Sequence, residues 1–278
     1  MNNETYDFPT KGINKYTTEY IRNLQDLTGK VVLDVPCGDG RASYEFKKKG
    51  AQVIAYDLFP DFMLVKDIQS KYADLSQTLP LENDSVDYII SQEGIEHIPN
   101  QLKVLQEFNR VLKKGGTLLI TTPNDSQAKV RLSNFIMESD LWKRMPPTEV
   151  DSIWFAEDDS SKLYYGHIFL LGVQRFQSLL SFSGFKTTKR IKTDSSTSSL
   201  ILGVLFYPFI TLMTFFGYFL YRNKNQHVDE KSRKRILYER VLLNLLPSTM
   251  FNKHIFWEMK KEDNIVDTVS KLRKMYRN

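Results

Sequence analysis

A glycine-rich turn directly after an apolar strand constrains the fold of this chain more than any other feature of its sequence. The run Val31–Asp34 is apolar and ends in a carboxylate, and Gly38 and Gly40 follow it closely. A helix is expected to begin near Arg41. Glycine lets a backbone approach a ligand, and the first turn of a helix offers unpaired N–H groups. The strand, the turn and the helix together predict a binding site for a nucleoside-containing cofactor.

Two common phosphate-binding loops fit this turn poorly. The dinucleotide fingerprint needs a third glycine at the position of Ser43. The P-loop needs Lys followed by Ser or Thr after its last glycine, and this chain has Arg41 and Ala42 there. A tight turn that binds no ligand stays open as the alternative.

A second strand strengthens the cofactor interpretation. The run Gln52–Asp57 also ends in a carboxylate, about 20 residues after Gly38. A carboxylate at this place can accept hydrogen bonds from both hydroxyls of a bound ribose. Asp57 is equally suited to cap a helix, because Pro60 and Asp61 follow it.

The order of these and later motifs resembles class I S-adenosylmethionine-dependent methyltransferases, in particular those of the ubiquinone pathway. The resemblance extends over about residues 30–192. The segments that carry it are Val31–Ala42, Gln52–Asp57, Tyr72–Leu75, Asp84–Ile90, Ile95–Pro99, Thr117–Asn124, Tyr165–Ile168 and Val173–Phe185.

The resemblance implies an α/β fold, with a Rossmann-like, doubly wound sheet of seven strands. Phe185–Ile191 and His254–Lys260 are expected to be the last two strands, the second inserted antiparallel, with an apolar helical insertion between them. A helix over Leu102–Leu112 is expected to end in a glycine cap at residues 113–116. The expected parts are a helical lead-in (1–29), a methyltransferase core (30–195) with a substrate cap (124–165), a membrane-associating insertion (196–250), and the last strand with a tail (251–278).

S-adenosylmethionine is the cofactor that the resemblance implies. Asp34 and the glycine turn would meet its amino-acid end, Asp57 its ribose, and Asp74 with Leu75 its adenine. Pro36 stands where the family usually has glycine, and its fixed φ and missing donor are expected to change affinity rather than abolish binding. The expected cofactor-binding residues are Asp34, Pro36, Cys37, Gly38, Gly40, Asp57, Leu58, Asp74, Leu75 and Gln92.

Glu93, Glu96 and His97 are the candidate catalytic residues, in a Glu-x-x-Glu-His pattern. On a helix, carboxylates three residues apart share a face, and His97 can join them. Oxygen ligands with one imidazole suit a divalent ion such as magnesium or zinc. In the ubiquinone-pathway and small-RNA 2′-O-methyltransferases this spacing holds a metal, and His167 resembles the further histidine of the RNA enzymes.

Two other interpretations of this motif stay open. His97 is as well suited to act as a general base without any metal, because a hydroxyl acceptor has to lose its proton. Glu-His-Ile-Pro also occurs in members of the family that bind no metal, where it shapes the turn into the next helix.

The segment between Asn124 and Tyr165 is a long insertion in the place where the acceptor pocket is usually capped. It also carries the acidic run Glu157–Asp159. Its aromatic content favours an apolar or ring-bearing acceptor, although such residues are often simply core. A prenylated quinone precursor and a lipid-linked sugar are the candidate acceptors. The aromatic residues are Phe135, Trp142, Trp154, Phe155, Tyr164 and Tyr165.

The segment Leu200–Tyr221 contains no charged side chain and is long enough to cross a hydrocarbon layer of about 30 Å. A buried core helix is the alternative. Both expected flanking strands belong to one sheet, and Ile236–Leu246 is too short to cross back. We therefore expect the apolar segment to bend near Pro208 or Gly217 and enter one leaflet from the cytoplasmic side, with the amphipathic second segment in the interface. The basic flanks are Lys186, Lys189, Arg190, Lys192, Arg222, Lys224, Lys231, Arg233, Lys234 and Arg235.

Composition fits a membrane-surface enzyme in a reducing compartment. The chain has 278 residues, a formal net charge of +5 and one cysteine, so no disulfide framework is expected. The N-terminal residues do not resemble a secretory signal, and the mild charge gives no reason to expect nucleic acid as a partner. Two further functions stay open, a catalytically idle membrane scaffold and a nicotinamide-dependent oxidoreductase.

Overall fold

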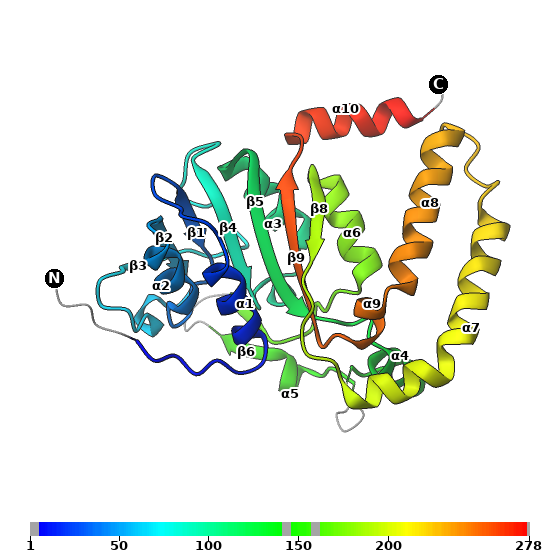
Figure 1. Cartoon of the computed structure of the whole chain (residues 1–278), viewed down its shortest axis with the longest axis horizontal. Helices are drawn as coiled ribbons and strands as arrows, with labels where there is room; N and C mark the ends of the chain where they lie inside the picture. Colours follow the sequence, from blue (N-terminus) through cyan, green and yellow to red (C-terminus); the bar gives the residue numbers. More distant parts are fainter. Residues whose placement is uncertain (1–5, 141–145, 157–161, 277–278) are drawn as a thin grey trace.

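The structure is a computed structural model that describes residues 6–140, 146–156 and 162–276. Its centre is a seven-stranded sheet with the strand order β3-β2-β1-β4-β5-β9-β8 (Figure 1). Strand β9 runs antiparallel to both of its neighbours. The strands are β1 (Val31–Asp34), β2 (Gln52–Asp57), β3 (Ser70–Tyr72), β4 (Val86–Gln92), β5 (Leu112–Pro123), β8 (Phe185–Arg190) and β9 (His254–Lys261).

Helices cover both faces of this sheet (Figure 1). On one face α1 (Ile13–Arg22) and α2 (Arg41–Lys48) pack together, and Phe46 of α2 is fully buried. On the other face lie α3 (Gln101–Val111), α6 (Val173–Phe182) and α10 (Ile265–Met275). Because both faces are covered, apolar residues at the centre of these strands are fully buried, among them Leu33, Ile89 and Leu118. This is the Rossmann-like, doubly wound sheet that the sequence predicted, with the antiparallel strand in the expected place.

The predicted glycine cap of α3 is wrong. The helix ends at Val111, and Leu112 is already extended and pairs with Val86 of β4. The pairing of β4 with β5 then shifts register and resumes at Tyr88 and Thr117. Gly115, with a φ of 74°, therefore serves an irregular stretch of β5 and not the end of a helix.

The segment between β5 and α6 forms the cap. It contains α4 (Ala128–Met137), α5 (Glu149–Ser152) and a two-stranded hairpin of β6 (Ile153–Ala156) and β7 (Leu163–Tyr165). Trp142 and the acidic run Glu157–Asp159, which the sequence singled out, lie outside the described residues.

The insertion between β8 and β9 consists of α7 (Thr197–Tyr221), α8 (Glu230–Leu245) and α9 (Pro247–Phe251). Helix α7 runs along the lower edge of the molecule and then turns upward (Figure 1). Pro208 lies inside α7, where its ring removes a backbone donor, as the predicted bend requires. The close approach of Gly203 to Phe251 of α9 holds the first part of the helix against the domain.

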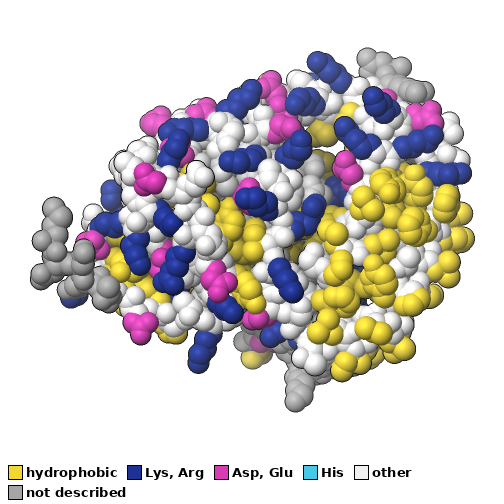
Figure 2. Space-filling view, in the orientation of Figure 1, with side chains coloured by type: hydrophobic (Ala, Val, Ile, Leu, Met, Phe, Trp, Pro, Cys, Tyr) yellow, Lys and Arg dark blue, Asp and Glu magenta, His cyan; other side chains and the backbone are white. Residues whose placement is uncertain are grey.

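Most of α7 is exposed, and only 6% of its most apolar 18-residue window is buried. This exposure excludes the alternative of a buried core helix. By length and composition α7 is the one helix in the described part of the chain that could cross a membrane. Apolar side chains gather over α7 and α8, with Lys and Arg side chains above them (Figure 2).

Helix α8 is longer than the predicted amphipathic segment and packs between α6 and α7. The Arg240 guanidinium donates to the Gln174 carbonyl of α6 at 2.9 Å, and Asn244 donates to Thr214 of α7 at 2.7 Å. This packing against the domain differs from the expected position of a helix lying alone in a membrane interface.

Candidate functional site

A cavity of about 280 Å³ opens where β1, β2 and β4 end. Ligands of open α/β sheets bind at this edge because the strands present their following loops there. Two of the expected catalytic residues, Glu93 and His97, also line the cavity. The expected cofactor-binding residues that line it are Asp34, Pro36, Cys37, Gly38, Asp57, Leu58, Asp74, Leu75 and Gln92.

Asp57 organises the glycine turn. Its Oδ2 accepts a hydrogen bond from Gly38 N at 2.8 Å, and its Oδ1 accepts one from Phe59 N at 2.8 Å. Each carboxylate oxygen has a second lone pair, which leaves acceptor capacity toward the cavity. Asp57 therefore keeps capacity for a ligand, and it does not cap the short helix Pro60–Phe62, whose N-cap residue is Phe59 and which has no side-chain cap hydrogen bond.

Gly40 shapes the cavity from outside its lining. It has a φ of 83°, and an added Cβ would lie 2.2 Å from the Met63 sulfur. Glycine is required here for both reasons. Gly94, after β4, has a related role, because a Cβ there would lie 2.6 Å from the Pro36 ring.

Asp34 and Asp74, two further acidic residues of the cavity, have different hydrogen-bonding partners. Asp34 accepts a hydrogen bond from the Ser43 hydroxyl at 2.6 Å, and burial raises the pKa of Asp34 to about 7 despite that bond. Asp74 is also buried, but an ion pair with Lys162 at 2.7 Å and a hydrogen bond from Ser76 N keep its pKa below the usual range. Lys162 comes from the predicted cap, so this segment packs against the cavity.

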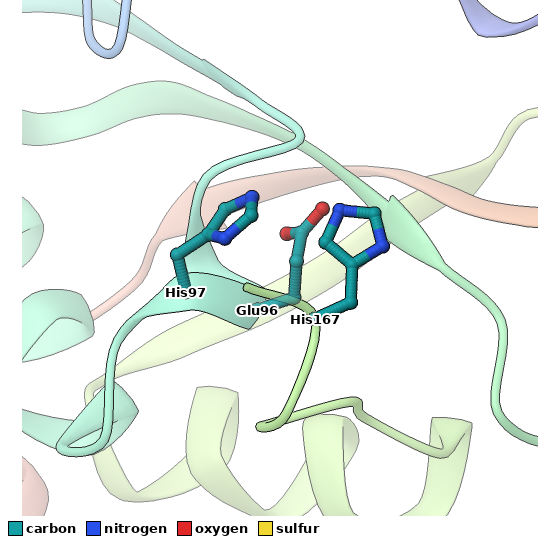
Figure 3. Close-up of side chains that lie close together, drawn as sticks. All are labelled: Glu96, His97 and His167. Atoms are coloured by element: carbon teal, nitrogen blue, oxygen red, sulfur yellow. The ribbon is translucent and has the colours of Figure 1, made fainter. Parts of the chain in front are cut away.

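Glu96, His97 and His167 converge beside the cavity (Figure 3). One ligand atom from each lies within 4.8 Å of the others. The Thr122 hydroxyl donates to Glu96 Oε2 at 3.0 Å, whereas the buried Oε1 has no hydrogen-bond partner among the described residues. His97 Nδ1 lies 2.7 Å from the Tyr165 carbonyl, so this nitrogen carries the proton and Nε2 keeps its lone pair.

Glu93 belongs to a different group. It has a φ of 49° in the turn after β4, and the short helix that contains Glu96 begins only at Ile95. The two carboxylates therefore do not share a helical face as predicted. Glu93 Oε1 accepts from the Thr121 hydroxyl at 2.8 Å, and its Oε2 lies 3.5 Å from His254 Nε2. The three side chains that lie close enough to share a metal ion are Glu96, His97 and His167, without Glu93.

Burial disfavours the charged forms of both glutamates. It raises the pKa of Glu93 and of Glu96 above their usual range, and the charge of Glu93 raises that of Glu96 further. A nearby cation would offset this cost, as would a proton accepted from a substrate.

Sequence reasoning missed several residues of the site. Trp154 was noted only as a cap aromatic, yet its ring stacks on His97 at 5.6 Å between centroids and meets the Phe59 ring edge-on at 5.5 Å. His254 opens β9, and an antiparallel strand begins at the edge where its parallel neighbour ends. The predicted antiparallel strand that starts at His254 therefore already implied that this residue lies at the carboxyl edge of the sheet. Nothing in the sequence indicated the bond between Asn14 and Gln92.

Comparisons with known proteins agree with this geometry. Residues 33–120 match the family model of a methyltransferase domain. A ubiquinone biosynthesis O-methyltransferase from Xanthomonas oryzae pv. oryzae is 31% identical over 134 residues, which cover 45% of this chain and 56% of that protein. The protein of the same name from Xanthomonas campestris pv. campestris is 30% identical over an equal length. The chain thus spans about half the length of the curated relatives it matches.

Solved structures resemble most of the chain at low identity. A SAM-dependent methyltransferase from Archaeoglobus fulgidus has a TM-score of 0.51 and 16% identity, covering 90% of this chain and 93% of its own. A (4+2)-cyclase has a TM-score of 0.50 and 13% identity, covering 92% and 86%. The fold is that of class I S-adenosylmethionine-dependent methyltransferases. Because a cyclase has a similar fold, the reaction has to be argued from the site.

Proposed function

We propose that this protein transfers a methyl group from S-adenosylmethionine to an oxygen atom of a small or lipid-linked acceptor. The observation that carries this proposal is one cavity with Asp34, Asp57 and Asp74 on one side and His97 on the other, next to Glu96. The first group suits a nucleoside with an amino-acid tail, and the second suits a hydroxyl that has to lose a proton.

The residues of the cavity fit the cofactor that the family implies. The glycine turn presents backbone beside the pocket, and Asp57 retains acceptor capacity for ribose hydroxyls. When bound, S-adenosylmethionine supplies an electrophilic methyl group. The work of the chain is then to align the acceptor oxygen in line with that methyl group and to keep water out. Trp154 and Tyr165 of the cap cover the same cavity and support the second task.

The His97 imidazole has the geometry of a proton acceptor. Its Nδ1 is engaged by the Tyr165 carbonyl, which fixes the tautomer and directs the basic Nε2 away from that bond. Trp154 stacks on the same ring and limits its orientation. His97 would hold the proton that the acceptor hydroxyl releases.

A divalent ion is a second way to activate the acceptor. Glu96, His97 and His167 offer one oxygen and two nitrogen ligands, and the unpartnered Glu96 Oε1 suits such a cation. These three residues would hold a magnesium or zinc ion, which would lower the pKa of a bound hydroxyl. Glu93 would then act beside the site, through Thr121 and His254.

The class of acceptor follows from the cap and from the relatives. Trp154 and His97 line the cavity with stacked rings, and Phe59 supports Trp154 from outside the lining, which gives a surface suited to a planar or apolar group. The matched Xanthomonas proteins are ubiquinone biosynthesis O-methyltransferases. A lipid-linked acceptor would also explain why an exposed apolar helix is attached to the domain, and we place the enzyme at the cytoplasmic face of a membrane through α7.

The direct test is transfer of label. The purified protein, incubated with a membrane lipid extract and S-adenosylmethionine labelled in its methyl group, should produce a labelled lipid that mass spectrometry identifies. Cofactor binding without transfer to any extract would support the catalytically idle scaffold instead. Stabilisation by a nicotinamide dinucleotide, with none by S-adenosylmethionine, would support the oxidoreductase.

Asp57→Ala is expected to weaken binding of S-adenosylhomocysteine by at least about tenfold. The change removes the acceptor for ribose hydroxyls, and hydrogen bonds to charged groups contribute about 1.5–3 kcal/mol each. It also frees the Gly38 and Phe59 N–H groups from the carboxylate. Calorimetry measures the affinity, and Asp61→Ala, outside the cavity lining, is the matched control. Unchanged affinity in Asp57→Ala would contradict the cofactor assignment.

A further inference from the structure

A second hollow lies between α7 and α8, on the insertion and not at the carboxyl ends of the strands. It is an open groove of about 510 Å³. Phe209, Met213 and Tyr218 of α7 and Leu237 of α8 give it apolar walls. It lies in the part of the surface where exposed apolar side chains gather (Figure 2). A hydrocarbon chain suits such walls.

A cation is among the residues that line this apolar groove. Arg240 lines the groove, and its guanidinium donates to the Gln174 carbonyl at 2.9 Å and to the Ser178 hydroxyl at 3.2 Å. Both acceptors are neutral. Within the described ranges no carboxylate lies at ion-pair distance from Arg240, and Glu239, the neighbour in sequence, acts on it only through space. Burial lowers the pKa of Arg240, which shows that its charge is poorly solvated.

A second guanidinium, that of Arg131 on α4, contacts α8 one turn beyond Arg240. Asn244 lines the same groove, and its side-chain oxygen accepts a hydrogen bond from Arg131 of α4 at 2.9 Å. Burial also lowers the pKa of Arg131. Residues four apart on a helix face the same side, so Arg240 and Asn244, the partner of Arg131, present polar groups on the same side of α8. A half-buried cation that has only neutral partners favours a bound anion.

The groove has room for a ligand beside Gly217. This residue is among the lining residues, and a Cβ added there would have no atom within 4 Å. Apolar walls, open space and a cation in the lining match a molecule with an apolar chain and an anionic head.

We propose, building on the membrane attachment proposed above, that this groove binds one anionic phospholipid of the bilayer. Its phosphate would lie on Arg240, and an acyl chain would run between Phe209, Met213 and Leu237. The guanidinium recognises the charged headgroup and gives the site a preference for acidic lipids. The aromatic and aliphatic side chains of the groove contact the acyl chain. The groove is then a lipid site separate from the cofactor cavity, and it fixes the hairpin of α7 and α8 at the surface of the bilayer.

Native mass spectrometry of the full chain in mild detergent tests this site. With phosphatidylglycerol we expect one retained lipid per chain, and an affinity at least about tenfold higher than for phosphatidylcholine of equal chain length. Arg240→Gln should reduce that preference to within about twofold, because the charge that reads the phosphate is gone. Arg273→Gln removes an equal charge from an exposed position on α10, outside the basic flanks of the apolar segment, and should leave the preference intact.

Gly217→Leu tests the groove in a second way, because it adds a side chain and removes none of the contacts that Arg240 makes. Leucine at this position meets open space and favours the helix, so the protein should remain as thermostable as the unaltered chain. Its side chain fills the groove, and we expect affinity for phosphatidylglycerol to fall at least about fivefold. Inorganic phosphate in excess should not displace the lipid.

Three results would overturn the lipid site. They are equal affinity for the two lipids, unaltered binding in both Arg240→Gln and Gly217→Leu, and displacement by phosphate alone, which would reveal an anion site without a lipid. S-adenosylhomocysteine affinity and methyl transfer are measured in separate experiments. If the methyltransferase assignment fails, the lipid-binding results can therefore still be interpreted. Attachment of Arg240→Gln to phosphatidylcholine vesicles shows that α7 still binds membranes, and its loss would contradict a role limited to the headgroup.

Discussion

His97→Ala is expected to lower the rate of methyl transfer by about 100-fold or more while the affinity for S-adenosylhomocysteine stays close to that of the unaltered protein. His97 lines the cavity with its Nε2 available, and its orientation is fixed by the Tyr165 carbonyl and the Trp154 ring. Both proposed mechanisms require His97 Nε2, which acts as the proton acceptor in one and as a metal ligand in the other. Single-turnover kinetics with labelled cofactor measures the loss.

A chelator separates the two versions. If Glu96, His97 and His167 hold a divalent ion, chelation should stop turnover and a returned magnesium or zinc ion should restore it. His167→Ala should then resemble His97→Ala. If His97 acts as a base alone, chelation should have no effect. His227→Ala, an exposed histidine on the insertion, is the matched control. Full activity in His97→Ala would refute both versions.

The cofactor half of the site was predictable because its chemistry is local in sequence. The turn with Gly38 and Gly40 lies within a few residues of the strand that precedes it, and the predicted β2 ends at Asp57 as expected. Apolar runs bounded by glycine and carboxylates specify buried parallel strands closely. The order of the last strands followed from the resemblance and was also correct.

The acceptor half was harder to predict because it is assembled from distant segments. Glu96 and His97 precede α3, His167 follows the cap, and His254 follows the whole apolar insertion. Their meeting depends on how the cap folds over the sheet, which periodicity does not encode. Glu93 shows the local limit of such reasoning. The positive φ of 49° at Glu93 redirects its side chain. The three-residue spacing between Glu93 and Glu96 therefore does not place the two carboxylates on one helical face.

The apolar helical character and the length of the insertion were predicted, but its packing against the domain was not. Helix α7 has a mean composition that no soluble surface helix needs, so its exposure followed from the sequence. The hydrogen bonds that tie α8 to α6 and α7 involve Arg240, Asn244 and the Tyr207 hydroxyl. Polar residues on a helix suggest solvent when seen in sequence alone, and here some of them face neighbouring helices instead.

Replacement of Leu205 and Phe209 by glutamate is expected to release the protein from membranes, which the unaltered chain should bind even after washing in high salt. The two side chains are 69% and 61% exposed. Burial of each large apolar side chain of α7 in a bilayer contributes about 1.5–3 kcal/mol, and salt does not screen this term. Basic residues near anionic lipid add about 1 kcal/mol each, which salt does screen. Fractionation of membrane pellets measures the effect, with Phe135→Glu, at an 87% exposed position on α4, as the control.

Attachment without crossing is the form of membrane binding that the topology favours. Strands β8 and β9 are neighbours in one sheet, so the chain has to return to the side from which α7 departs. Helix α8, with 16 residues, extends only about 24 Å and carries several charges, which makes a return crossing costly. Tags at residues 1 and 278 should therefore both be accessible from the cytoplasm. A tag at residue 278 that is accessible only from outside would require a true crossing, and would mean that β9 cannot pair with β5 in the native protein.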